Sequence, residues 1–419
     1  MTTLILGGGI TGLAAAWLLK RRGEDAEVWE AASHVGGWVQ TLPWSGGYVE
    51  KGPQGVLVAP GSPMATLFKE LDLETKSPGH GLRWVGMGGG LIRVPGTPME
   101  LMKSPLLTRG AKARLMLEPF IPVRKAEPEE GLSAFAARRL GRGVAETLLP
   151  AMVAGILAAP VESLSVDALP KLRQWEATGS LVRGMSKGGR SELRVPKGGM
   201  GSLPKALAER LNVSKGLRAT RLERVGDQWQ VSGSGQVRKV DRVLLALPAY
   251  EATTLLATLA PQSAAALAAI PYTSVRLFHS RHVPLEPLRD GFGFLIHPPE
   301  GKGFLGALVP SWIDPGCAPG GIMQLRSFVG GAFPTDASLG DWDGVFATLR
   351  RWVPELPEAV DLREEWAERA IPRAELGHRR HLEAALGGLP KGIDWISNAR
   401  FGPGIRDVVE GLEDWFAKQ

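Results

Sequence analysis

The chain has 419 residues, of which 44% are hydrophobic and 22% are charged, and its formal net charge is +6. This size and balance predict two or three packed units and exclude a disordered chain. The single cysteine, Cys317, excludes an intrachain disulfide framework and a thiolate metal cluster, and it suits a reducing compartment.

The first thirty residues have the pattern of a dinucleotide-binding turn. An apolar strand runs into the sequence GGGITG from Gly7 to Gly12 and an Ala/Leu-rich helix, and a second strand ends at Glu30. Gly7 allows a tight turn, Gly9 lets the backbone approach a pyrophosphate, and Gly12 lets helix and sheet pack closely. The helix N-terminus then faces the phosphates, and the Glu30 carboxylate suits ribose hydroxyls but repels a 2′-phosphate. The pattern predicts FAD or NAD in preference to NADP.

The middle of the chain alternates between β-rich and helical segments. In chain order, the pattern predicts a helix over 63–71, strands over 82–94, a largely helical stretch over 97–193, short strands over 213–247 and 272–333, and helices over 342–352 and 378–386. Because β-rich and helical segments alternate after a parallel-sheet opening, the expected fold class is α/β.

The end of the chain repeats the order of its beginning. Residues 394–397 are predicted to form a strand and residues 400–404 a glycine-rich turn, and a helix follows from Ile405 with Asp407 in its first turn. This junction provides a second helix N-terminus for a polar ligand. We therefore expect both ends of the chain to meet around one cofactor, with the middle inserted.

Two side chains are candidates for ligand contacts. Trp38 directly follows the Gly36-Gly37 doublet and is placed to pack against a ring system, with the hydrophobic core as the alternative. Arg83 lies between the cofactor unit and the helical stretch and is a candidate anion clamp, because guanidinium binds carboxylates bidentately. The alternative for Arg83 is an ordinary surface arginine.

Hydrolytic and metal-dependent chemistry are disfavoured. Cys317 lies in a Pro/Gly loop without an adjacent base, so no nucleophile set can be assembled. His279 and His282 fall in a strand-like segment, where a three-residue step places them on opposite faces. His378 and His381 could share a helix face, but their cationic neighbours oppose metal binding. We expect no metal site.

Basic and apolar residues are mixed in one segment of the helical stretch. The basic ones are Lys103, Arg109, Lys112, Arg114, Arg124 and Lys125, and the apolar ones include Leu106, Leu107, Leu115, Met116, Leu117, Phe120 and Ile121. Two interpretations stay open: a solvated helical face over core residues, or a patch on an anionic membrane surface. Nucleic acid is not an expected partner, because no helix-turn-helix, ribonucleoprotein motif or zinc finger accompanies the charge. No apolar run reaches the roughly twenty residues of a membrane-spanning helix.

Further motifs carry a resemblance to a known family. They are GGW at 36–38, YVEKGPQG at 48–55, RWVG at 83–86, PKGGMGSLPKAL at 196–207, GFGFLIHPPEGKGFLGALV at 291–309, IPRAELGH at 371–378 and FGPGIRD at 401–407. With the glycine turn, they resemble the FAD-dependent protoporphyrinogen oxidases, a branch of the amine oxidase and phytoene desaturase superfamily. The resemblance covers nearly the whole chain, and the stretches at 291–309 and 371–378 point most narrowly to porphyrinogen oxidation.

The resemblance implies an FAD-binding Rossmann-like domain, a mixed-sheet substrate domain and a helical, membrane-facing insert. The expected limits are 1–80, 196–260 and 371–419 for the FAD-binding domain, 81–97 and 261–370 for the substrate domain, and 98–195 for the helical domain. Because the first strand follows directly on the N-terminus, we expect no signal peptide ahead of it and a cytoplasmic protein, with peripheral attachment to the inner face of the cell membrane as an extension.

The resemblance also implies the site residues. The cofactor is FAD, held by Gly7, Gly8, Gly9, Ile10, Thr11, Gly12, Glu30, Ala31, Gly37, Trp38, Gly52, Pro53, Gln54, Gly55, Ala219, Pro403, Gly404 and Ile405. The substrate contacts are Arg83, Phe292, Leu295 and Ala159, with Arg83 pairing a propionate and with Phe292 and Leu295 enclosing the tetrapyrrole. No side-chain base is implied. The chain departs from the family pattern at His34, Gln54, Ala158-Ala159 and Arg406.

The implied activity is oxygen-dependent, six-electron oxidation of protoporphyrinogen IX to protoporphyrin IX, in haem or chlorophyll biosynthesis. FAD takes hydride equivalents, and dioxygen is the partner that yields hydrogen peroxide. Three alternatives stay open: oxidation of coproporphyrinogen III to coproporphyrin III, another flavin amine-oxidase-type oxidoreduction, and a flavin-binding regulatory scaffold without turnover. The expected oligomeric state is a monomer or a homodimer.

Overall fold

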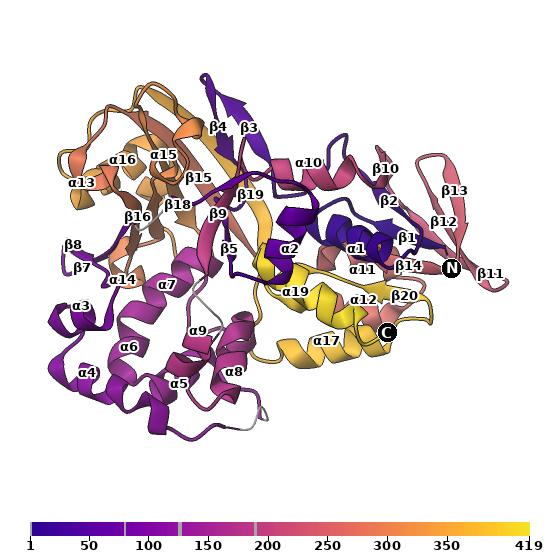
Figure 1. Cartoon of the computed structure of the whole chain (residues 1–419), viewed down its shortest axis with the longest axis horizontal. Helices are drawn as coiled ribbons and strands as arrows, with labels where there is room; N and C mark the ends of the chain where they lie inside the picture. Colours follow the sequence, from indigo (N-terminus) through magenta and orange to yellow (C-terminus); the bar gives the residue numbers. More distant parts are fainter. Residues whose placement is uncertain (1, 79–80, 125–127, 188–190) are drawn as a thin grey trace.

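Five parallel strands from three distant parts of the chain form one sheet. In the computed structural model, which describes residues 2–78, 81–124, 128–187 and 191–419, the strand order is β10-β2-β1-β14-β20 (Figure 1). The strands are β1 (Thr3–Leu6), β2 (Ala26–Glu30), β10 (Asn212–Lys215), β14 (Arg242–Leu245) and β20 (Ile393–Trp395). All four pairings are parallel. The start, the middle and the end of the chain are thus joined side by side.

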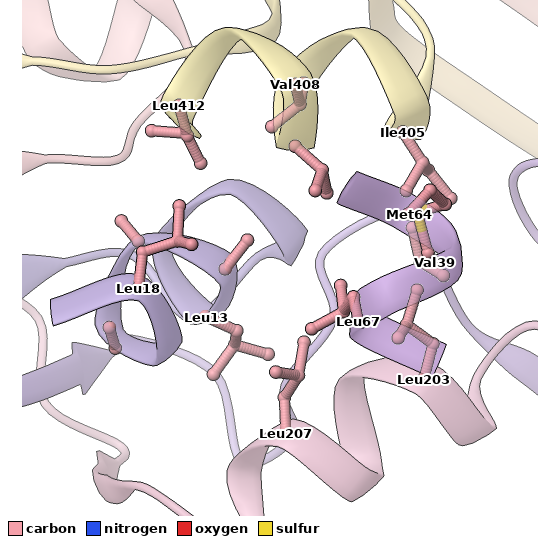
Figure 2. Packing of buried hydrophobic residues seen from close by; sticks show 14 of the residues in the cluster. Leu13, Leu18, Val39, Met64, Leu67, Leu203, Leu207, Ile405, Val408 and Leu412 are labelled. Carbon is pink, nitrogen blue, oxygen red and sulfur yellow. The ribbon is translucent and has the colours of Figure 1, made fainter. Parts of the chain in front are cut away.

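One face of this sheet is covered by helices from both ends of the chain. The helices are α1 (Ile10–Arg21), α2 (Pro63–Glu70), α10 (Ser202–Ala208) and α19 (Ile405–Phe416). Alternate strand residues point to this face, among them Ile5, Val28 and Leu244. Figure 2 shows Leu13 of α1 and Leu412 of α19 in the shared core. Burying this apolar layer fixes the start of α19 relative to the start of α1.

The opposite face of the sheet packs against a second group of elements. They are α11 (Ala249–Leu256), α12 (Pro261–Ala268), α17 (His378–Gly387) and the antiparallel sheet of β11 (Arg221–Val225), β12 (Gln228–Gly233) and β13 (Gln236–Val240). Leu4 and Leu245 are buried on this side. With helices on both faces, the sheet has the doubly covered form that parallel strands require.

A mixed seven-stranded sheet forms the second layer system. Its order is β19 (Asp361–Pro372), β15 (Tyr272–His282), β18 (Met323–Gly330), β17 (Phe304–Leu308), β16 (Gly291–Ile296), β7 (Leu82–Met87) and β8 (Gly90–Arg93). Only β16 and β7 pair in parallel among these described strands. Its hydrophobic core includes side chains of α13 (Glu286–Arg289) and α16 (Trp342–Trp352), and Trp312 of α15 (Pro310–Ile313) packs against it. The short helix α14 (Pro298–Gly301) lies between β16 and β17 in the sequence.

The segment between β8 and β9 (Glu192–Pro196) is helical. Its helices are α3 (Pro98–Lys103), α4 (Arg109–Met116), α5 (Leu132–Arg139), α6 (Arg142–Glu146), α7 (Leu148–Leu157), α8 (Pro170–Ala177) and α9 (Leu181–Lys187). A buried ion pair between Arg139 and Glu118 lies in its interior. None of the helices in the described part of the chain is long and apolar enough to span a membrane.

Short strands connect these layers. The hairpin β3 (Thr41–Trp44) and β4 (Gly47–Glu50) leads to β5 (Val56–Val58), and β9 pairs with both β5 and β6 (Thr75–Lys76). The predicted turn over 400–404 is partly helical, because the Ser397 side chain accepts a hydrogen bond from the Ala399 N–H and starts the one-turn helix α18 (Asn398–Phe401). The limits of the three domains given in the sequence analysis stay a prediction.

Candidate functional site

A cavity of about 1070 Å³ is lined by residues of the five-stranded and seven-stranded sheet regions and of α7. The residues that line it come from the turn after β1, the segment 51–57, α7, the seven-stranded sheet and the start of α19. The volume is at the upper end of the roughly 300–1,000 Å³ that ligand sites in proteins usually have. The cavity is therefore large enough for an extended ligand and a second molecule beside it.

The glycine turn forms one end of this cavity. Gly7 has a φ of +109°, and a Cβ there would lie 2.4 Å from the carbonyl oxygen of Ala246. A Cβ on Gly12 would lie 2.0 Å from the Gly7 oxygen, so the helix can start this close only with glycine. Gly9 lines the cavity, and a Cβ there would meet no atom within 4 Å. The open space at Gly9 is what a phosphate cradle requires.

Glu30 lies beside this turn at the end of β2. Its Oε2 accepts a hydrogen bond of 2.7 Å from the Gly8 N–H, and its Oε1 accepts one of 2.7 Å from the Ala32 N–H. Each carboxylate oxygen has a further lone pair, and Glu30 lines the cavity. The backbone thus orients the carboxylate with acceptor capacity left for ligand hydroxyls.

The other end of the cavity is formed by Trp38, the segment 52–55 and the start of α19. The Nζ of Lys51 lies 4.9 Å from the Trp38 ring centre. The Oε1 of Gln54 is buried and has no hydrogen-bond partner among the described residues. Gly404 precedes the first residue of α19, and its N–H donates to the Asp407 carboxylate at 3.3 Å. An unpartnered buried amide oxygen and a helix N-terminus both suit a polar ring system.

Most of the predicted cofactor residues lie together on this wall. Those that line the cavity are Gly7, Gly9, Ile10, Thr11, Glu30, Ala31, Gly37, Trp38, Gly52, Pro53, Gln54, Gly55, Ala219, Pro403, Gly404 and Ile405. Gly8 and Gly12 lie just behind the lining, where Gly8 holds Glu30 and Gly12 packs on Gly7. The set spans the cavity from Glu30 to the start of α19.

The four predicted substrate residues do not lie together. Leu295 lines the cavity, next to the apolar side chains of Leu305 and Phe328. Arg83 and Phe292 lie outside the lining, with the Arg83 guanidinium 4.1 Å from the Phe292 ring centre. Arg83 is exposed, and it has no ion pair with a described residue.

Ala159 is buried in the core of the helical segment, whereas Ala158 lines the cavity. Ala158 ends α7 in the left-handed conformation, with a φ of +49°. This conformation turns the chain at Ala158 and directs the next residue to the other side. The structure therefore places the neighbour of the predicted residue at the cavity.

The sequence interpretation did not include Lys51 and Arg326, which also line the cavity. Arg326 lies in the middle of β18 and is almost completely buried. The available signal was a lone charged residue inside the apolar run MQLRSFVG, because a buried charge requires partners.

His282 and His378 have polar contacts, whereas both ring nitrogens of His279 are buried without a hydrogen-bond partner among the described residues. His279 and His282 are both buried on β15, and the ring nitrogens of His282 contact the Pro357 carbonyl and the Ser280 hydroxyl, each at 2.8 Å. The Nε2 of His378 lies 2.8 Å from the Ala399 carbonyl. Within the described ranges, no group of three His, Cys, Asp or Glu side chains is placed to hold a metal ion.

Comparisons with known proteins agree with this geometry. The family model of flavin containing amine oxidoreductases matches residues 10–387. Human protoporphyrinogen oxidase is 30% identical over 381 aligned residues, which cover 79% of this chain and 78% of the human protein. Coproporphyrinogen III oxidase of Bacillus subtilis (strain 168) is 26% identical over 464 aligned positions, covering 97% of this chain and 95% of that protein.

Solved structures share the fold. A putative protoporphyrinogen oxidase from Exiguobacterium sp. 255-15 superposes with a TM-score of 0.79 at 21% identity, covering 100% of this chain and 99% of that one. A triple mutant of putrescine oxidase superposes with a TM-score of 0.74 at 19% identity over the whole of both chains. The predicted α/β architecture, with a Rossmann-like domain and a mixed-sheet domain, is confirmed.

Proposed function

Since the chain belongs to the family of flavin-containing amine oxidoreductases, we propose that it oxidises a porphyrinogen to the porphyrin. The predicted cofactor, FAD, is confirmed by the family, so NAD is no longer an alternative. When bound, FAD accepts hydride equivalents from a reduced substrate, and dioxygen is the proposed final acceptor. The observation that carries the proposal is the apolar cavity beyond the flavin end of the site, bordered by Leu295, Leu305 and Phe328.

The protein's own contribution is positioning and exclusion of water. Glu30 and the glycine turn would hold the nucleotide half of FAD, and the start of α19 would contact the other half. The wall from α7 and the seven-stranded sheet offers a large apolar macrocycle aliphatic and aromatic contacts. No side-chain base is assigned.

The first candidate substrate is protoporphyrinogen IX, which has two propionates. Its support is the similarity to human protoporphyrinogen oxidase and the exposed guanidinium of Arg83, which stacks on Phe292 and is free of ion pairs to described carboxylates. A propionate can accept two hydrogen bonds from such a guanidinium.

The second candidate is coproporphyrinogen III, which has four propionates. Lys51 adds a second cation without an ion pair to a described residue, and this one lines the cavity. The Bacillus subtilis relative also matches over a longer part of the chain. Both observations favour a substrate that carries more carboxylates.

One experiment tests the activity and ranks the substrates. The purified yellow holoprotein is mixed in air with each porphyrinogen, and porphyrin fluorescence and hydrogen peroxide are followed together. Six-electron oxidation requires three peroxides for each porphyrin. If the protein does not increase the rate of porphyrin formation above that of autoxidation with either substrate, the proposal is contradicted. Peroxide that forms with an added amine but with neither porphyrinogen would favour an amine-oxidase-type substrate, and no peroxide with any of these compounds would favour a regulatory scaffold.

We also propose peripheral attachment to the inner face of the cell membrane. Apolar side chains protrude from the helical segment: Met99 is 71% exposed, Met116 is 67% exposed and Phe120 is 78% exposed. Lys103 and Arg109 are exposed on the same helices. Such a mixture suits the headgroup region of an anionic bilayer.

The membrane patch is smaller than the sequence suggests. Lys112 is buried and donates to the carbonyls of Met102 and Ser104, at 2.9 and 2.7 Å, and Leu106 and Leu107 are core residues. Lys125 lies outside the described residues. Sedimentation with vesicles of anionic lipid tests the proposal, with the Phe120→Ser protein as the comparison. Equal sedimentation of both proteins with anionic and neutral vesicles would contradict it.

A further inference from the structure

Arg326 is a buried cation in the wall of the cavity. It lies on β18, is 3% exposed, and forms no ion pair with a described residue. Its guanidinium carbon lies 5.1 Å from the ring centre of Phe328, which also lines the cavity. Burying a charge without a counter-ion costs folding free energy, so the charge requires strong hydrogen bonds. Such a residue is expected where it also has a functional role.

The hydrogen bonds of Arg326 go to two consecutive carbonyls. One terminal nitrogen donates to the Gly52 oxygen at 2.6 Å, and the other donates to the Lys51 oxygen at 3.0 Å. Residues 51 and 52 lie 274 positions or more away in the sequence, at the start of the cavity-lining segment 51–55. The guanidinium therefore fixes the orientation of two successive peptide planes beside the flavin end of the site.

The orientation of the first plane has a consequence for the ligand. In a planar trans peptide, the N–H points opposite to the carbonyl oxygen. Because the Lys51 carbonyl points to Arg326, the Gly52 N–H points away from it, and this N–H donates to no acceptor among the residues that the structure describes. Gly52 itself lines the cavity. A backbone donor is thus held ready next to the space for the cofactor.

The Glu50 and Glu365 carboxylates act on the charge of Arg326 from a distance, and neither forms an ion pair with it. Burial lowers the pKa of Arg326 to about 10, which keeps the guanidinium charged at neutral pH. Burial raises the pKa of the nearby Glu50 carboxyl to about 7, so this group is only partly ionised there. His279, its cross-strand neighbour, is buried with a pKa held well below the usual range and stays neutral. A positive charge in a poorly screened site favours ligand forms with more negative charge.

We propose that Arg326 is a positioning residue for FAD, which fixes the Lys51–Gly52 peptide toward the cofactor and, through its charge, raises the reduction potential of bound FAD. Reduced FAD carries more negative charge than oxidised FAD, so a fixed cation stabilises it preferentially. The inference rests on FAD as the cofactor and is independent of the porphyrinogen substrate.

A buried arginine on the neighbouring strand provides a matched control. Arg281 on β15 is 5% exposed and donates to the carbonyls of Ser45, Trp44 and Cys317, at 2.5, 3.1 and 3.1 Å. It does not belong to the cavity lining. Removing either arginine leaves backbone carbonyls without donors, but only Arg326 acts on the segment 51–55.

The test measures the reduction potential and the FAD dissociation constant of purified holoproteins under anaerobic conditions. In Arg326→Gln, we expect the reduced form to lose about tenfold more affinity than the oxidised form, which lowers the potential by about 30 mV for a two-electron couple. Arg326→Lys keeps the charge but cannot span both carbonyls, so we expect weaker FAD binding with less than half of that potential shift. Arg281→Gln is expected to lower the melting temperature and to leave the potential unchanged.

Two outcomes would overturn the proposal. In the first, Arg326→Gln and Arg281→Gln differ from the parent equally little, both in reduction potential and in FAD dissociation constant. If Arg326→Gln does not fold, the decision falls to Arg326→Lys, where an FAD dissociation constant within twofold of the parent would refute the positioning role. Neither readout requires turnover, so an absence of porphyrinogen oxidation would not affect the result.

Discussion

The two ends of the cavity are built in different ways. At the nucleotide end, residues 7–12 and Glu30 come from one strand-turn-helix-strand unit, and the contacts offered to a ligand are mostly backbone groups. At the other end, the wall combines Trp38, the segments 51–57 and 403–408, and residues of α7 and of the seven-stranded sheet. Side chains such as Arg326 hold the backbone in place there. Substitutions in the strand-turn-helix-strand unit disturb the backbone that contacts the ligand, so few are tolerated. In a wall built from distant segments, single side chains can change independently.

The largest effect is expected from Gly12→Val. The Cβ would lie 2.0 Å from the Gly7 oxygen, and the backbone of the turn cannot move away without opening the cradle. We expect the purified protein to lose bound FAD entirely, as shown by the absence of flavin absorbance. Gly387→Ala is the control, because a Cβ there meets no atom within 4 Å and FAD content should not change. A yellow Gly12→Val protein would show that the nucleotide end tolerates variation after all.

A smaller effect at the same end is expected from Glu30→Ala. The change removes the carboxylate oxygen that accepts from the Gly8 N–H, and hydrogen bonds to charged groups contribute about 1.5–3 kcal/mol. FAD should bind roughly 10- to 100-fold more weakly, measured by flavin fluorescence during reconstitution of the apoprotein. Glu27→Ala, on the same strand but outside the cavity lining, should keep the parental affinity. Equal loss in both variants would assign the effect to the stability of the strand.

Arg83 lies outside the cavity lining, and as it is the proposed propionate contact, Arg83→Ala should raise KM by about tenfold. The lost propionate contact corresponds to about 1.5 kcal/mol, the lower limit for a charged hydrogen bond, because the guanidinium is exposed. Steady-state porphyrin formation measures the change, and FAD binding should not change. Arg93→Ala is the comparison, since Arg93 lies on the adjacent strand and pairs with Glu100. Kinetics equal to those of the parent would remove Arg83 from the substrate site.

The smallest effect concerns Glu50, close to Arg326. Burial raises its pKa from 4.5 to about 7, so between these values the folded protein holds a proton that the unfolded chain has released. The free energy of unfolding should therefore fall as pH rises through this window, by about 1 kcal/mol between pH 6 and 7. Urea unfolding of Glu50→Gln, which cannot ionise, should show a shallower pH dependence than the parent. Glu355 is exposed, so Glu355→Gln should have the same pH dependence of the unfolding free energy as the parent. If Glu50→Gln also keeps the parental pH dependence, another group is responsible for it.

The same contrast explains how far the sequence could predict the site. The turn at 7–12, Glu30 and the start of α19 follow from local rules on glycine, strand ends and helix starts, and they lie together at the cavity. The contact of Arg326 with the carbonyls of residues 51 and 52 depends on how β18 lies against a segment from the other end of the chain, which no local pattern encodes. The shift from Ala159 to Ala158 arises from a single left-handed residue at the end of α7.

Charge patterns were also ambiguous without the structure. Lys112 and Arg114 belong to the same basic run as Arg109, but they donate to backbone carbonyls of the helical segment, whereas Arg109 is exposed. A count of basic residues cannot separate cations that hold the fold from cations that face a partner, because both kinds occur at helical spacing.

The order of strands in the parallel sheet also governs when the cofactor site can form during synthesis. β1 pairs with β14, about 240 residues later, and β14 pairs with β20, about 150 residues further along the chain. Contacts between such distant segments form slowly, and the intermediate exposes apolar surface to aggregation and chaperones. Because α19 closes both the core and the cavity, FAD can bind with full affinity only after nearly the whole chain has been made. The supply of flavin during expression should therefore determine the yield of soluble protein, since a ligand that binds only the folded state stabilises it by mass action.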